Sequence, residues 1–180
     1  MADRIAVHGA SGSGKSTLAR ALADRLGLER TELDALFHQP GWTELPDAEF
    51  RAEVAAVVAG ERWVVEGNYR QVRDLVWARA ELIVVLDPPR WTVMRQLLGR
   101  TVRRGITRSE LWNGNRESLV NLVSTNADRN VVLWSWRTLD RYHTEVPAEV
   151  GVEAPHARLV VLRTRDDVIR FVDEAGARRK

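Results

Sequence analysis

The sequence has 180 residues, of which 44% are hydrophobic and 29% are charged, as in a globular chain of one domain. The formal net charge of +2 is too small to indicate general nucleic-acid binding, and the lack of cysteine excludes a disulfide framework and a thiolate zinc site. We find no signal peptide and no apolar run approaching the roughly 20 residues of a membrane span, so we expect a cytoplasmic protein.

Short apolar strands alternate with helical segments along the chain. The predicted strands cover residues 4–8, 29–33, 62–66, 82–86 and 158–162. The predicted helices cover residues 15–26, 46–60, a short stretch ending near 79, 90–103, 116–143 and 166–176. This alternation is typical of an α/β domain, here spanning residues 1–180, whose parallel sheet is covered by helices on both faces. Ligands of such folds bind beyond the carboxyl ends of the strands.

A glycine-rich loop of the form GxxxxGK[ST] lies between the first predicted strand and the first predicted helix. Its backbone N–H groups can surround phosphate oxygens, Lys15 can reach the β- and γ-phosphates, and the Ser16 hydroxyl can ligate Mg²⁺. The loop therefore predicts binding of ATP and Mg²⁺. The predicted nucleotide-binding residues are Gly9, Ser11, Gly12, Ser13, Gly14, Lys15, Ser16 and Thr17.

Acidic side chains follow three of the predicted strands. Asp34 can hold a Mg²⁺-bound water, accept a proton from a substrate hydroxyl or cap a helix, and we favour a functional role. Glu66 is our candidate for organising Mg²⁺ together with the loop serine, because Asn68 and Arg70 beside it form a polar substrate rim. Asp87 competes for this role, but two prolines follow it, which favours a turn residue.

Positive charge is concentrated between residues 95 and 116, where six arginines face a single acid, Glu110. An Asn-Gly-Asn turn at 113–115 lies between Trp112 and Arg116. A solvated helix face would also look like this, but the turn formers favour a short lid over ATP at about residues 103–116. We expect Arg100 and Arg116 to contact phosphate, because arginine forks suit phosphoryl oxygens.

Three further segments resemble a known family when taken with the glycine loop. They are Leu33-Asp34, Val65-Glu66-Gly67-Asn68-Tyr69 and Leu111-Trp112-Asn113-Gly114-Asn115-Arg116. The chain resembles, over nearly its whole length, the small P-loop kinases typified by adenylate and shikimate kinases. It is most similar to the bacterial group labelled DNA topology modulation or adenylate-kinase-like proteins. The resemblance implies a P-loop NTPase fold with five parallel strands in the order 2-3-1-4-5. It also implies a substrate-binding insert at about residues 34–60 and an arginine-rich lid after strand four.

The resemblance also assigns individual residues. Residues 66–70 resemble the Asp-Gly-Phe-Pro-Arg turn of adenylate kinases, which implies that Arg70 contacts the phosphate of the acceptor. Gly99-Arg100 resembles the start of the adenylate kinase lid, and residues 163–165 resemble the loop on adenine, so Arg165 is added to the nucleotide site. The implied substrate residues are Asp34, Asn68, Tyr69 and Arg70.

Two functions follow from this interpretation. The first is an ATP-dependent phosphotransferase of the nucleoside monophosphate kinase-like type, with a small-molecule acceptor and with catalytic residues Lys15, Asp34, Glu66, Arg100 and Arg116. The second is an ATP-binding regulatory protein that influences DNA topology with weak or no kinase activity. We expect a monomer or homodimer that contacts neither a membrane nor, directly, nucleic acid, because no nucleic-acid-binding motif is present.

Overall fold

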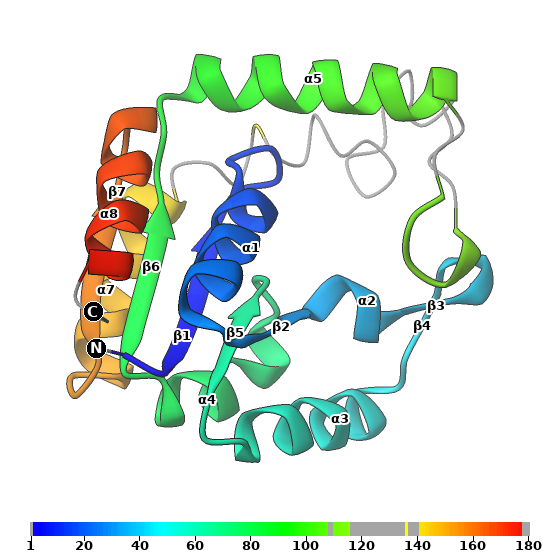
Figure 1. The fold of residues 1–180 in the computed structure, drawn as a ribbon. Helices are drawn as coiled ribbons and strands as arrows, with labels where there is room; N and C mark the ends of the chain where they lie inside the picture. Colours follow the sequence, from blue (N-terminus) through cyan, green and yellow to red (C-terminus); the bar gives the residue numbers. More distant parts are fainter. Residues whose placement is uncertain (1, 108–109, 116–135, 137–140, 178–180) are drawn as a thin grey trace.

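The computed structural model describes residues 2–107, 110–115, 136 and 141–177 (Figure 1). A five-stranded parallel sheet forms its centre. In spatial order its strands are β2 (Glu29–Glu32), β5 (Trp63–Glu66), β1 (Arg4–Gly9), β6 (Leu82–Leu86) and β7 (Arg158–Leu162). When these five strands are numbered along the chain the order is 2-3-1-4-5, so the predicted topology is confirmed.

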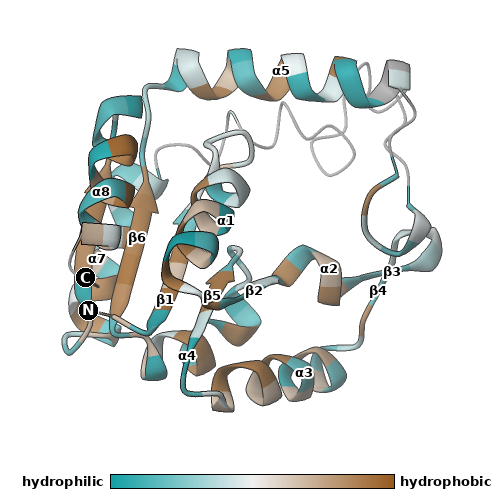
Figure 2. Cartoon of the chain, viewed as in Figure 1, coloured by the Kyte–Doolittle hydropathy of each residue, from teal (hydrophilic) through white to brown (hydrophobic). Residues whose placement is uncertain are grey.

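Helices cover both faces of this sheet because successive strand residues point to opposite sides. On one face, Ile5 and Val7 pack with α1 (Lys15–Leu26) and α8 (Arg165–Ala177). On the other face, Ala6 packs with α3 (Asp47–Ala59), α4 (Arg70–Arg79) and α7 (Glu145–Glu153). The hydropathy colouring shows the central strands β1, β5 and β6 as largely apolar, whereas the edge strand β2 is polar (Figure 2). Burial on both faces explains why the central strands β5, β1 and β6 are almost continuously apolar.

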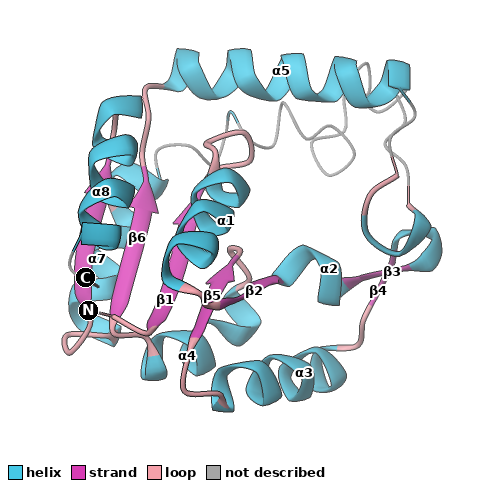
Figure 3. Cartoon of the chain, in the orientation of Figure 1, coloured by secondary structure: helices cyan, strands magenta, loops and turns pink. Residues whose placement is uncertain are grey.

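Helix α5 (Arg90–Thr107) crosses above the carboxyl ends of the central strands (Figure 3). Val93 and Leu97, which belong to this helix, are fully buried. The helix extends four residues beyond the predicted end at 103, and the Thr107 hydroxyl donates a hydrogen bond to the Arg103 carbonyl at 2.9 Å. The predicted lid therefore begins as helix.

The predicted substrate-binding insert after β2 is built from short elements. They are α2 (Leu33–Phe37), the hairpin strands β3 (His38–Gln39) and β4 (Thr43–Glu44), and the 3-10 helix η1 (Pro40–Trp42) between them. Helix α3 completes the insert, and a second 3-10 helix, η2 (Trp112–Gly114), lies against the hairpin. The hairpin was not predicted, because strands of two residues carry no periodic pattern.

Helix α7 was also missed by the sequence prediction, which placed no element between residue 143 and the strand at 158–162, and Pro147 lies in its first turn. Proline is tolerated in the first turn of a helix, where its missing N–H has no intrahelical partner. Most of the predicted helix at 116–143 lies outside the described residues. Within the described part of the chain, no helix combines the length and the apolar character needed to span a lipid bilayer.

Candidate active site

The glycine-rich loop connects β1 directly to α1, as predicted. Gly14 precedes the helix with φ of 99°, and a side chain placed there would meet no atom within 4 Å. No side chain caps the first turn of α1, so its backbone N–H groups point into this open space. A helix N-terminus with exposed N–H groups binds anions, because the helix dipole adds to their partial positive charge. The loop is therefore built to hold phosphate.

Lys15 folds back across this loop, where its Nζ donates a hydrogen bond to the Ala10 carbonyl at 3.2 Å. Burial lowers the pKa of Lys15, while the negative charges of Asp34 and Glu66 act in the opposite direction. The neighbouring Ser16 hydroxyl hydrogen-bonds Glu66 at 2.9 Å, so the loop and Glu66 lie at the same edge of the sheet. Ser13 is buried in the same loop, and its hydroxyl has no hydrogen-bond partner there.

Glu66 lies at the carboxyl end of β5 and is only 4% exposed. Its Oε2 accepts a hydrogen bond from the Ser16 hydroxyl at 2.9 Å, and its Oε1 accepts one from Arg30 Nη1 at 3.0 Å. Burial raises the pKa of Glu66. Because the Ser16 proton is directed to Glu66, the lone pairs of the Ser16 oxygen stay available to a cation.

These two residues fit a Mg²⁺ site of the kind that uses few protein ligands. Mg²⁺ prefers oxygen and commonly keeps waters and substrate phosphates as ligands. The described residues hold no group of three or more acidic or histidine side chains that could bind a metal alone. Asp87, the competing acid, instead pairs with His143 at 2.8 Å and with Arg163 at 3.3 Å. This pairing agrees with the structural role preferred for Asp87.

Asp34 lies in the first turn of α2 and not at its N-cap, which is Glu32, so the capping alternative does not apply. The Tyr69 hydroxyl donates a hydrogen bond to Asp34 Oδ1 at 2.7 Å. The Tyr69 ring packs on Phe37 and Phe50, with ring centroids 4.7 and 5.2 Å away. Two predicted substrate residues, Asp34 and Tyr69, are thus in direct contact.

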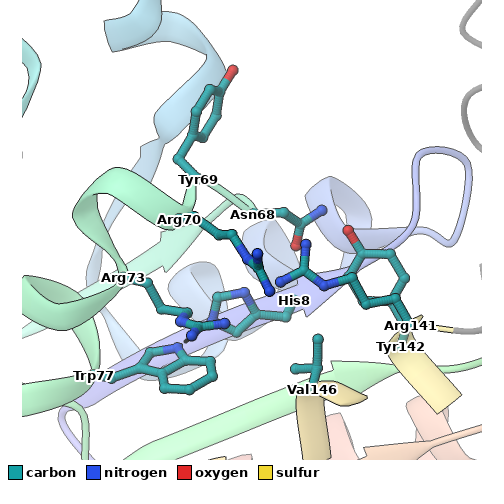
Figure 4. A pocket seen from close by; sticks show the side chains of 9 residues that line it. All are labelled: His8, Asn68, Tyr69, Arg70, Arg73, Trp77, Arg141, Tyr142 and Val146. Carbon is teal, nitrogen blue, oxygen red and sulfur yellow. Dashed lines mark hydrogen bonds between the residues drawn. The ribbon is translucent and has the colours of Figure 1, made fainter. Parts of the chain in front are cut away.

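A pocket opens beside these residues, between the ends of β1 and β5 and helix α7 (Figure 4). Asn68, Arg70, Arg141 and Tyr142 point toward one another across it, whereas Tyr69 points away. Arg70 is paired with Glu149 at 3.2 Å, yet its side chain is 63% exposed. Arginines lining an open pocket can exchange a surface carboxylate for a ligand anion, because an exposed ion pair is weak.

The floor of this pocket is formed by His8 and Trp77. Trp77 Nε1 donates a hydrogen bond to His8 Nε2 at 2.8 Å, and burial lowers the pKa of His8 to about 4. His8 is therefore neutral at physiological pH. The Arg73 guanidinium stacks over the Trp77 ring at 4.6 Å. Burial raises the pKa of Tyr142 to about 12, so this residue keeps its proton as well.

The arginines predicted to contact the nucleotide differ in their positions relative to the loop. Arg100 reaches the loop from α5, where its Nη2 donates a hydrogen bond to Ser11 Oγ at 2.9 Å. Arg116 lies outside the described residues. Arg165 is exposed at the start of α8, next to a capping pair in which Thr164 and Asp167 exchange hydrogen bonds at 2.9 and 3.1 Å.

The C-terminal part of the predicted lid contacts the insert. We call residues 111–115 the docked segment, because its side chains bind the backbone and side chains of residues 32–42. Asn113 Nδ2 donates to the His38 carbonyl at 2.7 Å, and Trp112 Nε1 donates to Glu32 Oε2 at 2.8 Å. The sequence favoured a flexible turn here, and these long-range hydrogen bonds were not visible in it.

Sequence reasoning missed Arg30 and Glu32, which flank the candidate Mg²⁺ site. Arg30 bridges the carboxylates of Glu32 and Glu66. The signal was available in β2, where Arg30 and Glu32 are charged residues in a strand that pairs with the fully buried β5. Charged side chains beside a buried strand are stable only when paired, and this predicts partners across the sheet.

Three comparisons place the chain among known proteins. A family model described as an AAA domain matches residues 5–170. A gluconokinase from Sinorhizobium meliloti 1021 has a similar structure, with 22% identity, 96% of this chain and 89% of that chain covered, and a TM-score of 0.54. A shikimate kinase from Bacteroides thetaiotaomicron also has a similar structure, with 15% identity, 97% of this chain and 96% of that chain covered, and a TM-score of 0.54.

A shikimate kinase from Acinetobacter baumannii in complex with shikimate is also similar, with 17% identity, 94% of this chain and 88% of that chain covered, and a TM-score of 0.52. A search of curated protein sequences found no match. At these identities the structural matches establish a shared fold.

Proposed function

This chain belongs to the AAA domain family and has the fold of small P-loop kinases, and we propose that it is an ATP-dependent phosphotransferase acting on a small molecule. One observation carries the proposal. At the carboxyl edge of the sheet, Ser16 hydrogen-bonds Glu66, and the charges of Glu66 and Asp34 act on Lys15. Phosphoryl transfer needs a phosphate cradle, a cation site and an acidic group for the acceptor, and this edge combines all three.

On the nucleotide side, the loop N–H groups and Lys15 hold the phosphates, and Arg165 lies by the adenine. Ser16 and Glu66 would hold Mg²⁺, which when bound offsets negative charge on the phosphates. Arg100, already at the loop through Ser11, is positioned to contact the transferred phosphoryl group. Together these residues stabilise negative charge and orient the γ-phosphoryl group for attack.

On the acceptor side, Asp34 receives the proton of the attacking hydroxyl. The hydroxyl oxygen forms a bond to the γ-phosphorus, and the bond from phosphorus to the bridging oxygen breaks with its electron pair remaining on ADP. For a phosphate acceptor no proton is transferred, and the role of Asp34 is then limited to orientation. A base must lie within hydrogen-bond reach of the proton that it removes, so the acceptor is placed next to Asp34.

The second contact of the acceptor is the pocket of Asn68, Arg70, Arg141 and Tyr142. Its cationic lining favours an acceptor with an anionic group, such as the phosphate of a nucleoside monophosphate or the carboxylate of a hydroxy acid. Gluconate and shikimate, named for the structurally similar proteins, are hydroxy acids. Both acceptor classes therefore belong in the test.

We further propose that residues 103–116 act as a lid during turnover. Six arginines with one acid between residues 95 and 116 repel one another until phosphate is present. Closure over ATP excludes water and so protects the phosphoryl group from hydrolysis. The docked segment is the part of this lid that contacts the acceptor insert.

The test is a screen for acceptor-dependent ADP formation with nucleoside monophosphates, nucleosides, polyols and hydroxy acids. We expect one class to stimulate ATP consumption by the unaltered chain, and Lys15→Ala to abolish it together with stabilisation by ATP and Mg²⁺. If ATP and Mg²⁺ stabilise the chain but no acceptor is phosphorylated, the kinase proposal is wrong. That result would favour the ATP-binding regulatory alternative, for which DNA supercoiling would then be assayed.

A further inference from the structure

We propose that Tyr69 and His38 are positioning residues for Asp34. In this inference a chain of hydrogen bonds from His38 through Tyr69 engages one carboxylate oxygen of Asp34 and directs the other toward the acceptor. The inference rests on the proposed phosphotransferase function and deepens it, because it assigns a role to two residues that do not touch the reacting atoms themselves.

The contacts join two segments that are far apart in sequence. Asp34 and His38 belong to the insert after β2, and Tyr69 follows β5. The Tyr69 hydroxyl lies 2.7 Å from Asp34 Oδ1 and 3.4 Å from His38 Nε2. A phenol has a single proton, and the shorter contact to a carboxylate takes it. The longer contact must therefore be a weak donation from His38 Nε2–H to the phenol oxygen.

The surroundings of His38 agree with this direction. If Nε2 carries the proton, the neutral ring leaves Nδ1 as a bare acceptor. His38 Nδ1 is buried and has no hydrogen-bond partner. A proton on Nδ1 would therefore leave a buried N–H without an acceptor, which is costly. Aromatic rings hold His38 in place, with Phe37 at 5.2 Å and Trp42 at 5.3 Å between centroids.

Packing brings Tyr69 to Asp34. Gly67, two residues before Tyr69, has φ of 147°, and a Cβ at this position would lie 2.7 Å from the Leu33 Cβ. The end of β5 therefore lies directly against the start of α2, an approach that only glycine permits. Phe37 and Phe50 then fix the plane of the Tyr69 ring. The pKa of Tyr69 is raised by burial and by Asp34, which keeps its hydroxyl protonated.

The consequence is a carboxylate with two unequal oxygens. Oδ1 accepts from Tyr69, so its lone pairs are directed toward the Tyr69 hydroxyl. Oδ2 is left to receive the proton of the acceptor hydroxyl while the acceptor oxygen bonds to the γ-phosphorus and ADP departs. Tyr69 keeps its own proton throughout, and it therefore acts by orienting Asp34 and not by exchanging protons.

The experiment is a double-mutant cycle between Tyr69→Phe and Asp34→Asn, with the best acceptor from the screen. Tyr69→Phe removes the hydroxyl and keeps the ring contacts. We expect kcat to fall about 10- to 100-fold, the range of a hydrogen bond to a charged group, with KM for ATP and the unfolding temperature nearly unchanged. In the Asp34→Asn background, Tyr69→Phe should have no further effect, because its role passes through the carboxylate.

The other tyrosine of the chain provides a matched comparison. Tyr142→Phe also removes one buried phenol hydroxyl, but it does not contact Asp34, so its effect should add to that of Asp34→Asn. His38→Phe tests the outer link. It keeps an aromatic ring and loses the donor, and its smaller effect on kcat should vanish when Tyr69 is already phenylalanine. If Tyr69→Phe lowers the unfolding temperature substantially, a cycle between His38→Phe and Asp34→Asn replaces it, and the effect of His38→Phe should then vanish in the Asp34→Asn background.

Three outcomes are distinguishable. A Tyr69→Phe variant with unaltered kcat, beside an inactive Asp34→Asn variant, overturns the inference and leaves the phosphotransferase function intact. Additive effects of Tyr69→Phe and Asp34→Asn also overturn it, since they would mean that Tyr69 acts independently. Absence of acceptor-dependent turnover in the unaltered chain overturns the proposed function and the inference with it.

Discussion

The side-chain amide of Asn68 makes two hydrogen bonds with the backbone of Gly9. The Gly9 N–H donates to Asn68 Oδ1 at 3.3 Å, and Asn68 Nδ2 donates to the Gly9 carbonyl at 2.7 Å. Asn68 follows β5, and Gly9 ends the neighbouring strand β1. The amide therefore continues the pairing of the two strands beyond the end of β5 and holds the first residue of the phosphate loop.

We predict that Asn68→Ala weakens ATP binding about tenfold or more. The substitution leaves two backbone groups of the buried Gly9 without partners, at a cost of roughly 1–3 kcal/mol for each buried group. Isothermal titration with ATP and Mg²⁺ measures the effect. Asn68→Asp is the matched variant, because it keeps the acceptor for Gly9 N–H and loses the donor, and it should give an intermediate affinity. Unchanged ATP affinity in Asn68→Ala would show that the loop does not depend on this contact.

Glu66→Gln should remove the contribution of Mg²⁺ to nucleotide binding. The substitution keeps the size of the side chain but takes away the charge that faces Ser16. We expect ATP alone to raise the unfolding temperature as before, and added Mg²⁺ to raise it no further. Glu32→Gln is the control, because Glu32 shares Arg30 with Glu66 but does not contact Ser16. A full Mg²⁺ effect in Glu66→Gln would exclude Glu66 from the cation site.

His8 should make the fold sensitive to acid between pH 6.5 and about 4. Its pKa is lowered by burial to about 4 in the native chain, so at intermediate pH the unfolded chain binds a proton that the native chain does not. The contribution of His8 to the free energy of unfolding is thus fully present above pH 6.5. It is lost as the pH falls through this window, by about 3 kcal/mol at the lower end.

The measurement is urea unfolding at several pH values. His8→Gln should lose less stability than the unaltered chain on acidification from pH 6.5 to 4. The exposed His156 provides the control, and His156→Gln should follow the unaltered chain. Parallel curves for the unaltered chain and His8→Gln would mean that His8 titrates equally in both states.

Asn115→Ala should release the docked segment from the insert. Asn115 is 4% exposed, accepts a hydrogen bond from the Trp42 N–H at 2.8 Å and donates one to the Gln39 carbonyl at 2.9 Å. We expect the Trp42 amide to exchange with deuterium much faster in this variant, while amides of α1 keep their protection. Glu61→Gln, at an exposed side chain, is the control. An unchanged exchange rate at Trp42 would show that the contact does not hold the two segments together.

The central sheet could be predicted from the sequence because its signals are local. Strands β5, β1, β6 and β7 are short, largely apolar runs, whereas β2 is charged, and β6 was predicted with its observed limits. The predictions failed where a local signal was ambiguous. Helix α7, which carries Pro147 in its first turn, was not predicted, and the two-residue strands β3 and β4 have no period to detect. The predicted site residues that the structure describes lie at or near the carboxyl edge of the sheet, where Arg165 is exposed at the start of α8, after β7.

The sequence by itself determined the phosphate loop, because all its requirements lie within eight consecutive residues. Glycine conformation, the lysine and the following helix are properties of neighbours in the chain. Only the tertiary structure decided which side chains form hydrogen bonds with residues distant in the sequence. Arg30 with Glu66, Tyr69 with Asp34 and the docked segment with the insert are pairs separated by more than 30 residues. Such contacts depend on strand register and on close packing at Gly67, and neither leaves a local pattern in one sequence.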